Sequence, residues 1–404
     1  KSKLKFIKFP FSHPSYILYT SGTTGAPKAI VHSTGGVILQ HFKEHKLHND
    51  LRFNDRIMWY TNIAWMMYHW VVSSLGCNAT LVLYDGVPIT KKNNNFDGSL
   101  LWKVADKEKL THLGISPKYI STLEDINENP INKYNINSLR WLLAAGSPVA
   151  PSQFDWIYKN IKKDIGFASI SGGSEVLACF MLGSPLHPVR RGELTVKGLG
   201  MSVEIYNSKN ESVIGEPGDL VCTEPFPSMP ITFWGKDGDA RYKKTYFEER
   251  KEVWTHGDLA ELKPHGSGVI YGRTDNTLNP GGVRIGTAEI YNICELFTEI
   301  EDCLVFGNQI NNDEEIILCI KLSHNNKLDN KLSKIIRSKI RENASPRHVP
   351  QKIYEVTDIP YTMNGKRVEG AAKWMLAGKE IPNLSSISNP ECLKQYAGLN
   401  NKKA

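Results

Sequence analysis

The chain has 404 residues, which is too long for one compact core, so two or more domains are expected. Apolar residues make up 41% and aromatic residues 10%, a composition that excludes a disordered or fibrous protein. The 49 Lys and Arg residues exceed the 42 Asp and Glu residues, and the net charge of +7 suits anionic small molecules. No basic helix or basic–aromatic stripe indicates nucleic-acid binding.

The sequence also limits membrane and redox chemistry. No segment has about 18 consecutive apolar residues, so we expect no membrane span. The seven cysteines form no C-x-x-C pair and their number is odd, which argues against a zinc site or a disulfide framework. A reducing compartment, the cytosol, is therefore expected. Cys392 stands in a polar stretch near the C-terminus, where we expect a free surface thiol.

Predicted elements divide the chain into three stretches. Up to about residue 190, the apolar runs RIMWYTN, ATLVLYDG, HLGIS, LRWLLAAG and GFASISGG end in turn residues and alternate with helical patterns, which predicts a buried, mostly parallel sheet. From Arg191 to Arg273 we expect a smaller antiparallel β layer with little helix. The linker TDNTLNPGG follows, and then a helix capped by Thr287.

The predicted fold class is therefore α/β with two domains. Residues 1–274 form a large domain of βα layers plus the antiparallel β subdomain, and residues 276–404 form a small, mobile α/β domain. The boundary lies at Asp275, inside the Asn-, Pro- and Gly-rich linker.

Residues 16–32, YILYTSGTTGAPKAIVH, place a Ser/Thr/Gly burst between two apolar runs. The spacing differs from the G-x-x-x-x-G-K-[ST] phosphate loop, and AIVH predicts a second strand, with a helix starting near Ser33. Glycine amides, hydroxyls and an ammonium group can still hold phosphate; here they come from Thr20, Ser21, Gly22, Thr23, Thr24, Gly25 and Lys28. The alternative is a polar hairpin turn.

Two further segments carry acidic groups that suit a nucleotide. WTHGDLAEL, KPHGSG and VIYGRTD predict a hairpin that brings Asp258 and Arg273 within reach of one ligand, such as a ribose; the alternative is a solvated ion pair. ASISGGSEVL places Gly173, Ser174 and Glu175 at the end of a buried strand, where Glu175 can hold Mg²⁺ on ATP phosphates. Its alternative is a helix N-terminus capped by Ser174.

Two more segments are ambiguous by themselves. LLAAGSPVAPS puts Gly146, Ser147 and Pro148 after a strand, either as an edge against a purine or as an ordinary turn. IPYTMNGKRVEG predicts a tight turn at Asn364 and Gly365 that presents Lys366, which is otherwise an exposed turn lysine.

The segments TSGTTGAPK, SGGSE, HGD, GRTDNTLNPGGVRIGTAEIY and PYTMNGK occur in one order. In that order and spacing the chain resembles the adenylate-forming superfamily, which includes acyl-CoA synthetases, luciferases and peptide-synthetase adenylation domains. YDGVP, PVRRGEL, KGLGMSVE and CTEPFPSMP most resemble the branch that ligates acetoacetate to coenzyme A. The resemblance covers nearly the whole chain.

The resemblance implies a two-step ligase that uses Mg²⁺, ATP and coenzyme A. A carboxylate attacks the α-phosphate of ATP, and the thiol of coenzyme A then attacks the acyl-adenylate. Thr20–Lys28 would hold the β- and γ-phosphates, and Gly146–Pro148 would line the adenine. Within the SGGSE segment, Gly173 would help to bind the nucleotide, Ser174 would touch the α-phosphate and Glu175 would bind Mg²⁺.

The remaining implied roles lie in the second half of the chain. Asp258 and Arg273 would hold the ribose, and Arg284 a phosphate. Lys366 would bridge the attacking carboxylate and the α-phosphate after the small domain rotates about Asp275. The strand 281–284 would then face the thiol channel.

Substrate and completeness are further implications of the resemblance. Relatives that use acetate carry a Trp at the place of Gly172, so a larger acid such as acetoacetate is expected here. Ala64–Trp70 either lines that acyl pocket or forms an aromatic core helix. Only about 19 residues precede the phosphate loop, whereas the family has a long segment there, so we expect a C-terminal portion of a synthetase. The alternatives are a ligase for another short acid, such as acetate or propionate, and an inactive nucleotide-binding fragment.

Overall fold

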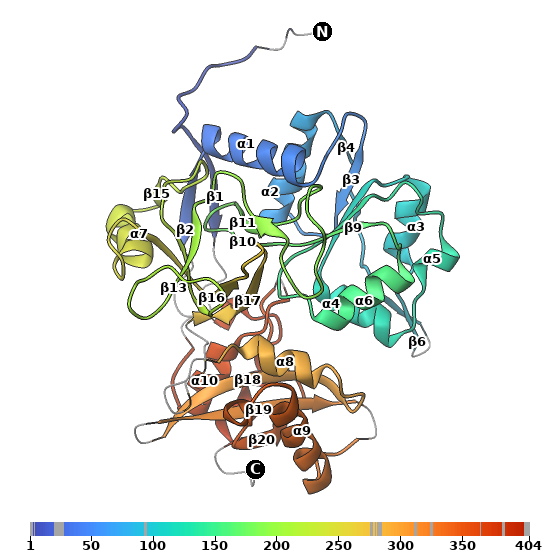
Figure 1. The fold of residues 1–404 in the computed structure, drawn as a ribbon, viewed down its shortest axis with the longest axis vertical. Helices are drawn as coiled ribbons and strands as arrows, with labels where there is room; N and C mark the ends of the chain where they lie inside the picture. The colour runs from blue at the N-terminus through green and yellow to red at the C-terminus, as the bar shows by residue number, and fades with distance from the viewer. Residues whose placement is uncertain are drawn as a thin grey trace.

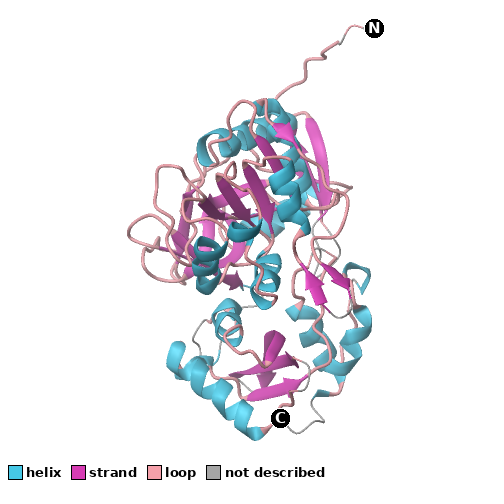
Figure 2. Cartoon of the chain, turned by 90° about the vertical axis from the view of Figure 1, so that its right-hand side faces the viewer, coloured by secondary structure: helices cyan, strands magenta, loops and turns pink. Residues whose placement is uncertain are grey.

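The computed structural model of the chain describes residues 3, 5–19, 28–92, 95–274, 278, 280, 285–310, 313–323, 326–363, 365–381 and 384–399. In both Figure 1 and Figure 2 the elements from α8 (Thr287–Cys294) onward lie below the rest of the molecule. Within the described ranges, no helix combines the length and the apolar character that crossing a membrane requires.

A five-stranded, fully parallel sheet forms the centre of the upper part, in the order β4-β3-β7-β8-β9. Its strands are β3 (Arg56–Trp59), β4 (Thr80–Leu81), β7 (His112–Ile115), β8 (Trp141–Ala144) and β9 (Gly166–Ser169). The helices between them are α3 (Leu100–Lys107), α4 (Pro117–Asp125), α5 (Pro130–Lys133) and α6 (Pro151–Asn160). The predicted parallel sheet is confirmed. Because parallel strands share one carboxyl edge, the segments after β8 and β9 leave the sheet on the same side.

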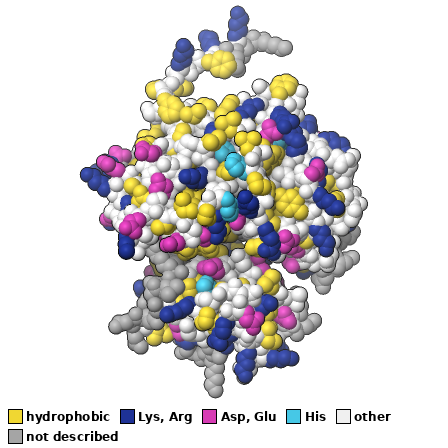
Figure 3. Space-filling model, viewed as in Figure 1, with side chains coloured by type: hydrophobic (Ala, Val, Ile, Leu, Met, Phe, Trp, Pro, Cys, Tyr) yellow, Lys and Arg dark blue, Asp and Glu magenta, His cyan; other side chains and the backbone are white. Residues whose placement is uncertain are grey.

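The N-terminal segment forms the predicted pair of strands. β1 (Pro14–Tyr19) runs antiparallel to β2 (Ala29–Ser33), and β15 (Thr232–Phe233) pairs with the other side of β2. Helix α1 (Thr34–Lys43) follows directly, capped by Ser33 Oγ, which accepts a bond from Gly36 N at 3.2 Å. It continues as a π-helix, η1 (Glu44–His48), and both pack against η2 (Ser73–Cys77), which follows α2 (Met66–Val72). Figure 3 shows apolar side chains gathered around the N-terminal segment at the top of the molecule.

The antiparallel layer expected between Arg191 and Arg273 is present. A four-stranded sheet has the order β13 (Val203–Tyr206), β14 (Gly218–Cys222), β16 (Trp254–Leu262) and β17 (Gly268–Arg273). A second sheet contains β10 (Ser171–Gly173), β11 (Ala178–Leu182) and β12 (Val196–Lys197), and a separate hairpin contains β5 (Thr90–Lys92) and β6 (Asn95–Asp97). Helix α7 (Gly238–Phe247) also lies in this stretch and packs on β15 and β16.

The C-terminal part has its own sheet, β18 (Ile300–Ile310), β19 (Asp313–Leu322) and β20 (Lys352–Glu355). The helices beside it are α8, α9 (Asn330–Asn343), α10 (Glu369–Leu376) and α11 (Lys394–Ala397), with 3₁₀ turns at 346–348, 384–386 and 390–393.

Two details of the C-terminal part correct the sequence-based expectation. The N-cap of α8 is Gly286, one residue before Thr287, and Glu289 Oε2 accepts the Gly286 amide at 3.0 Å. Cys392 is buried rather than exposed, and burial raises the pKa of its thiol to about 12.

Candidate functional site

A pocket of about 310 Å³ opens where three segments of the upper part meet. These are the residue before β2, the turn after β10, and the β16–β17 hairpin with the end of α7. The lining residues are Lys28, Glu175, Lys244, Thr245, Tyr246, Glu248, Glu249, Thr255, His256, Gly257 and Arg273. Three of the predicted site residues, Lys28, Glu175 and Arg273, therefore share one pocket.

The predicted hairpin is confirmed in its register. Asp258 on β16 lies directly opposite Arg273 on β17. Arg273 Nη1 donates to Asp258 Oδ1 at 3.1 Å and to the carbonyl oxygen of His256 at 3.0 Å. Asp258 is only 8% exposed, whereas the Arg273 side chain is 45% exposed. The guanidinium thus lies at the pocket surface, and the carboxylate holds it there.

Gly257 provides the space that Arg273 occupies. Its φ is +83°, and a Cβ built on it would lie 2.8 Å from Arg273 Nη2. A side chain at this position would be strained and would also push the guanidinium away.

Glu175 lies in a turn between two antiparallel strands. The chain turns over residues 174–177, and the amides of Val176 and Leu177 bond to the Gly173 carbonyl at 3.2 and 2.9 Å. The alternative of a helix capped by Ser174 is therefore wrong, because the chain turns back into β11 at residue 178 before a helical turn can continue.

The charge of Glu175 is set by its neighbours. Burial by itself would raise the pKa of its carboxyl group, but electrostatic interactions with His256, Arg273 and Lys28 outweigh it, and the pKa is lowered. The carboxylate is therefore ionised at neutral pH. Gly173 stands next to it, since a Cβ at Gly173 would meet Glu175 Oε2 at 2.5 Å.

Lys28 is the described end of the predicted phosphate loop. Its Nζ lies 5.3 Å from the ring centroid of Tyr246, which stacks on Trp254 at 3.8 Å. The remaining loop residues, Thr20, Ser21, Gly22, Thr23, Thr24 and Gly25, lie outside the described residues.

Gly146, Ser147 and Pro148 form an exposed turn after β8. Gly146 has φ +112°, and a Cβ there would contact the Trp65 ring at 3.7 Å. Trp65 immediately precedes α2, whose Met66, Met67 and Trp70 are buried in the core. The core alternative therefore holds for these three residues of Ala64–Trp70, and the Trp65 ring lies near the turn at Gly146.

Lys366 is exposed and is not among the residues that line the pocket. The predicted tight turn is present, with Gly365 N bonded to the Thr362 carbonyl at 2.9 Å and φ +75° at Gly365. Asn364, Asp275, Arg284 and the strand 281–284 lie outside the described residues.

The position of Gly172 gives a reason for glycine other than the acyl pocket expected from the sequence. A Cβ on Gly172 would lie 1.9 Å from the backbone carbonyl oxygen of Ala178 on the paired strand β11. Glycine is thus required here by the close approach of two backbones. A Trp at this position in this chain would have to displace the paired strand.

Eight of the eleven lining residues were not predicted from the sequence, and of these His256 and Tyr246 contact predicted site residues. His256 belongs to the quoted HGD segment and is 5% exposed; burial lowers the pKa of its imidazole, although Asp258 and Glu175 oppose this. Tyr246 comes from α7, which carries no motif of its own. The HGD segment could therefore have indicated His256, whereas no sequence motif indicates Tyr246.

The side chains around Glu175 suit a metal ion that is bound together with nucleotide phosphates. Among the described residues no group of three or more His, Cys, Asp or Glu side chains forms a metal cluster. A single ionised carboxylate beside Lys28 and Arg273 instead suits Mg²⁺ that arrives with nucleotide phosphates, because Mg²⁺ commonly takes one or two carboxylates plus phosphate oxygens.

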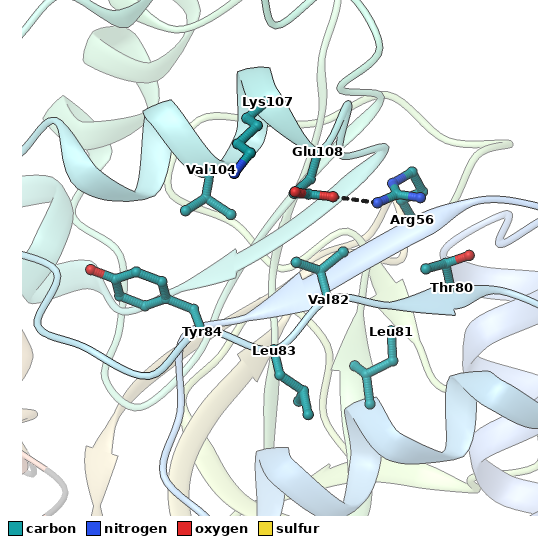
Figure 4. A pocket seen from close by; sticks show the side chains of 9 residues that line it. All are labelled: Arg56, Thr80, Leu81, Val82, Leu83, Tyr84, Val104, Lys107 and Glu108. Atoms are coloured by element: carbon teal, nitrogen blue, oxygen red, sulfur yellow. Dashed lines mark hydrogen bonds and ion pairs between the residues drawn. The ribbon is translucent and has the colours of Figure 1, made fainter.

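A second pocket, of about 350 Å³, lies along the edge strand β4 and the end of α3 (Figure 4). Its apolar wall faces an ion pair between Arg56 Nη2 and Glu108 Oε2, which are 2.5 Å apart. None of the predicted site residues lines it.

Comparison with known proteins gives consistent findings. The family model described as "AMP-binding enzyme" matches residues 8–229. The acetoacetyl-coenzyme A synthetase of Rhizobium meliloti (strain 1021) is 46% identical over 99% of this chain and 61% of its own length. That of Gallus gallus is 44% identical over 98% of this chain and 59% of its own length.

The solved acetoacetyl-CoA synthetase from Streptomyces lividans is 37% identical, with a TM-score of 0.92 over 100% of this chain and 62% of that one. The α/β fold is therefore shared. The chain spans about three-fifths of the length of the relatives that it matches.

Proposed function

Because the chain belongs to the AMP-binding enzyme family, we propose that it serves an ATP-dependent ligase that converts acetoacetate to acetoacetyl-CoA. The observation that carries the proposal is the shared pocket of Lys28, Glu175 and Arg273, with Asp258 holding the guanidinium. The substrate comes from the names of the relatives, and the seven free cysteines suit a cytosolic location.

The reaction proposed has two balanced steps. A carboxylate oxygen of acetoacetate attacks the α-phosphorus of ATP, so that an acyl–phosphate bond forms and pyrophosphate leaves. The sulfur of coenzyme A then attacks the acyl carbon, so that a thioester forms, AMP leaves and the thiol proton is released. Both steps depend on positioning and charge stabilisation.

The residues of the pocket suit these demands. Lys28 and the loop Thr20–Gly25 would hold the β- and γ-phosphates, while Glu175 would hold Mg²⁺, which offsets phosphate charge when bound. Asp258 and Arg273 would fix the ribose. The remaining proposed contacts are Gly146, Ser147 and Pro148 with adenine, Gly173 and Ser174 with the α-phosphate region, and Arg284 with a phosphate.

For Lys366 to reach the pocket, the C-terminal part of the chain must move in this proposal. Lys366 is exposed and does not line the pocket, so the part from residue 276 to 404 would rotate about Asp275 to bring its ammonium group to the reacting carboxylate. There it would stabilise the negative charge that builds up in the first step.

The test is acid-dependent exchange between ATP and pyrophosphate, with acetoacetate, acetate and no acid. Exchange with acetoacetate alone supports the proposal, and equal exchange with acetate supports a ligase for another short acid. Bound ATP without any exchange supports a nucleotide-binding fragment, whose catalysis belongs to a longer protein. Lys366→Ala should abolish exchange, whereas Lys379→Ala, which removes another exposed lysine of the C-terminal part, should not.

A further inference from the structure

The segment that follows Lys28 is hydrogen-bonded to the turn that carries Glu175. Strand β2, helix α1 and the π-helix η1 together send three buried side chains to backbone groups of residues 174–179. These bonds, which we call the turn clamp, join His32 Nε2 to Ser174 O (2.8 Å), His41 Nε2 to Leu177 O (2.7 Å) and Cys179 N to Glu44 Oε1 (2.9 Å).

The two histidines act as neutral donors. Each ring nitrogen faces a carbonyl oxygen, which can only accept, so Nε2 carries the proton. Both rings are 0% exposed. Burial lowers the pKa of His32 to about 4 and lowers that of His41 as well, so both rings are uncharged at neutral pH.

Glu44 completes the clamp as a fixed acceptor. Besides the Cys179 amide, its carboxylate accepts from Trp70 Nε1 at 2.7 Å and from Gln40 Nε2 at 3.2 Å. Burial would raise its pKa, but the charge of Lys43 and the hydrogen bonds from the Cys179 amide and Trp70 lower it. The ionised carboxylate thus ties α1, α2 and β11 together.

The turn needs such support because its backbone is strained. Leu177 is fully buried and has φ +46°, a left-handed conformation that a bulky side chain adopts at a cost. His41 binds the carbonyl of this same residue. The conformation around Glu175 is therefore imposed by neighbouring elements and is not an intrinsic preference of the SGGSEVL segment.

We propose that His32 is a positioning residue that sets the place of Glu175 relative to Lys28. His32 lies four residues after Lys28 on the same short segment and binds the carbonyl of the residue before Glu175. Through it, the strand that follows Lys28 and the turn that carries Glu175 form one unit. The inference rests on the proposed function, in which these two groups hold Mg²⁺ and phosphate.

His112 offers a matched control. It is also 0% exposed, its pKa is also lowered to about 4 by burial, and its Nε2 lies 2.8 Å from the carbonyl oxygen of Asn49. It lies on β7, however, and does not line the pocket. His32→Leu removes the one bond to Ser174, whereas His112→Leu removes the bond to Asn49 and a second bond between Nδ1 and Thr111 Oγ1 at 2.8 Å, so the control is at least as severe. His32→Gln retains an N–H donor.

Two measurements on these variants and the parent chain test the inference. The first is amide hydrogen exchange at Val176 and Leu177, which needs no ligand. It should be at least tenfold faster in His32→Leu, and close to the parent in His32→Gln and His112→Leu. Unchanged exchange in His32→Leu, or equal acceleration in His112→Leu, overturns the inference.

The second measurement is the Mg²⁺ concentration that gives half-maximal ATP binding. It should rise about tenfold in His32→Leu and less than threefold in the other two variants. A parent chain that binds no Mg·ATP refutes the proposed function, and with it the metal-positioning role. Faster exchange in His32→Leu with an unchanged Mg²⁺ requirement limits His32 to a structural role and also overturns the inference.

Discussion

Replacing Gly257 by Ala tests whether the placement of Arg273 depends on a missing side chain. Both Gly257 and Gly266 lie in the β16–β17 hairpin region with positive φ, +83° and +90°. A Cβ at Gly266 would meet nothing within 4 Å, whereas a Cβ at Gly257 would meet Arg273 Nη2 at 2.8 Å and Cζ at 3.3 Å. The two variants therefore share the backbone penalty and differ in the contact with the guanidinium.

The magnitudes follow from these contacts. A left-handed alanine costs about 1–2 kcal/mol at either position. In Gly257→Ala the guanidinium must also leave the His256 carbonyl and Asp258. Since the Arg273 side chain is 45% exposed, solvent screening reduces each lost bond to about 0.5–1 kcal/mol. We expect a total loss of about 2–4 kcal/mol for Gly257→Ala and about 1–2 kcal/mol for Gly266→Ala.

Urea unfolding measures the loss of stability, and titration calorimetry with Mg·ATP measures the function. A displaced guanidinium should weaken nucleotide binding about tenfold, which corresponds to about 1.4 kcal/mol, while Gly266→Ala should bind as the parent does. Equal stability and equal affinity in the two variants would refute the reasoning. Weaker binding in Gly257→Ala together with normal binding in Arg273→Ala would refute it as well.

Three further predictions concern stability. The buried imidazoles of His32 and His112 have pKa values lowered to about 4, whereas in the unfolded chain they take up protons as the pH falls below about 6.5. The free energy of unfolding should therefore decrease between pH 6.5 and 4, by about 3 kcal/mol for each histidine, and urea unfolding across this range measures the decrease. Asp219 and Arg250 form an ion pair 2.7 Å apart, and each side chain is 6% exposed. Asp219→Asn leaves the arginine charge buried without this partner and should lower the free energy of unfolding by about 3–5 kcal/mol in the same assay. The double variant Asp219→Leu with Arg250→Met should recover most of that loss. Gly172→Ala should lose about 1–3 kcal/mol from backbone overlap without any change in the preferred acid, measured by unfolding and by exchange with acetate and acetoacetate.

The sequence was informative where the structure depends on local chemistry. Apolar runs ending in Gly or polar turn residues predicted the parallel sheet, and the turn KPHGSG between two strand patterns predicted the hairpin that pairs Asp258 with Arg273. Local rules also placed the start of α1 at Ser33. These features depend on residues close in sequence, so hydrophobic period and turn chemistry suffice to find them.

Contacts between distant segments could not be predicted in the same way. His32 and Ser174 are 142 residues apart, and nothing in either segment indicates that one binds the other. Gly172 is a glycine because of the carbonyl of Ala178 on the paired strand, although the sequence suggested an open acyl pocket. Tyr246 reaches the site because it stacks on Trp254, a contact that depends on the packing of α7.

The charges of the pocket explain why nucleotide and metal should arrive together. The lining contains the cations Lys28, Lys244 and Arg273 and the carboxylates Glu175, Glu248 and Glu249, so its formal charge is balanced with His256 neutral. A triphosphate without a metal ion would be attracted by the three cations but repelled by the three carboxylates, because like charges at short range oppose binding. Under the proposed function, the Glu175 carboxylate would hold Mg²⁺, and the cation would offset that repulsion when bound. The low pKa of Glu175 is thus the property that this arrangement needs, since only the ionised carboxylate can bind the cation.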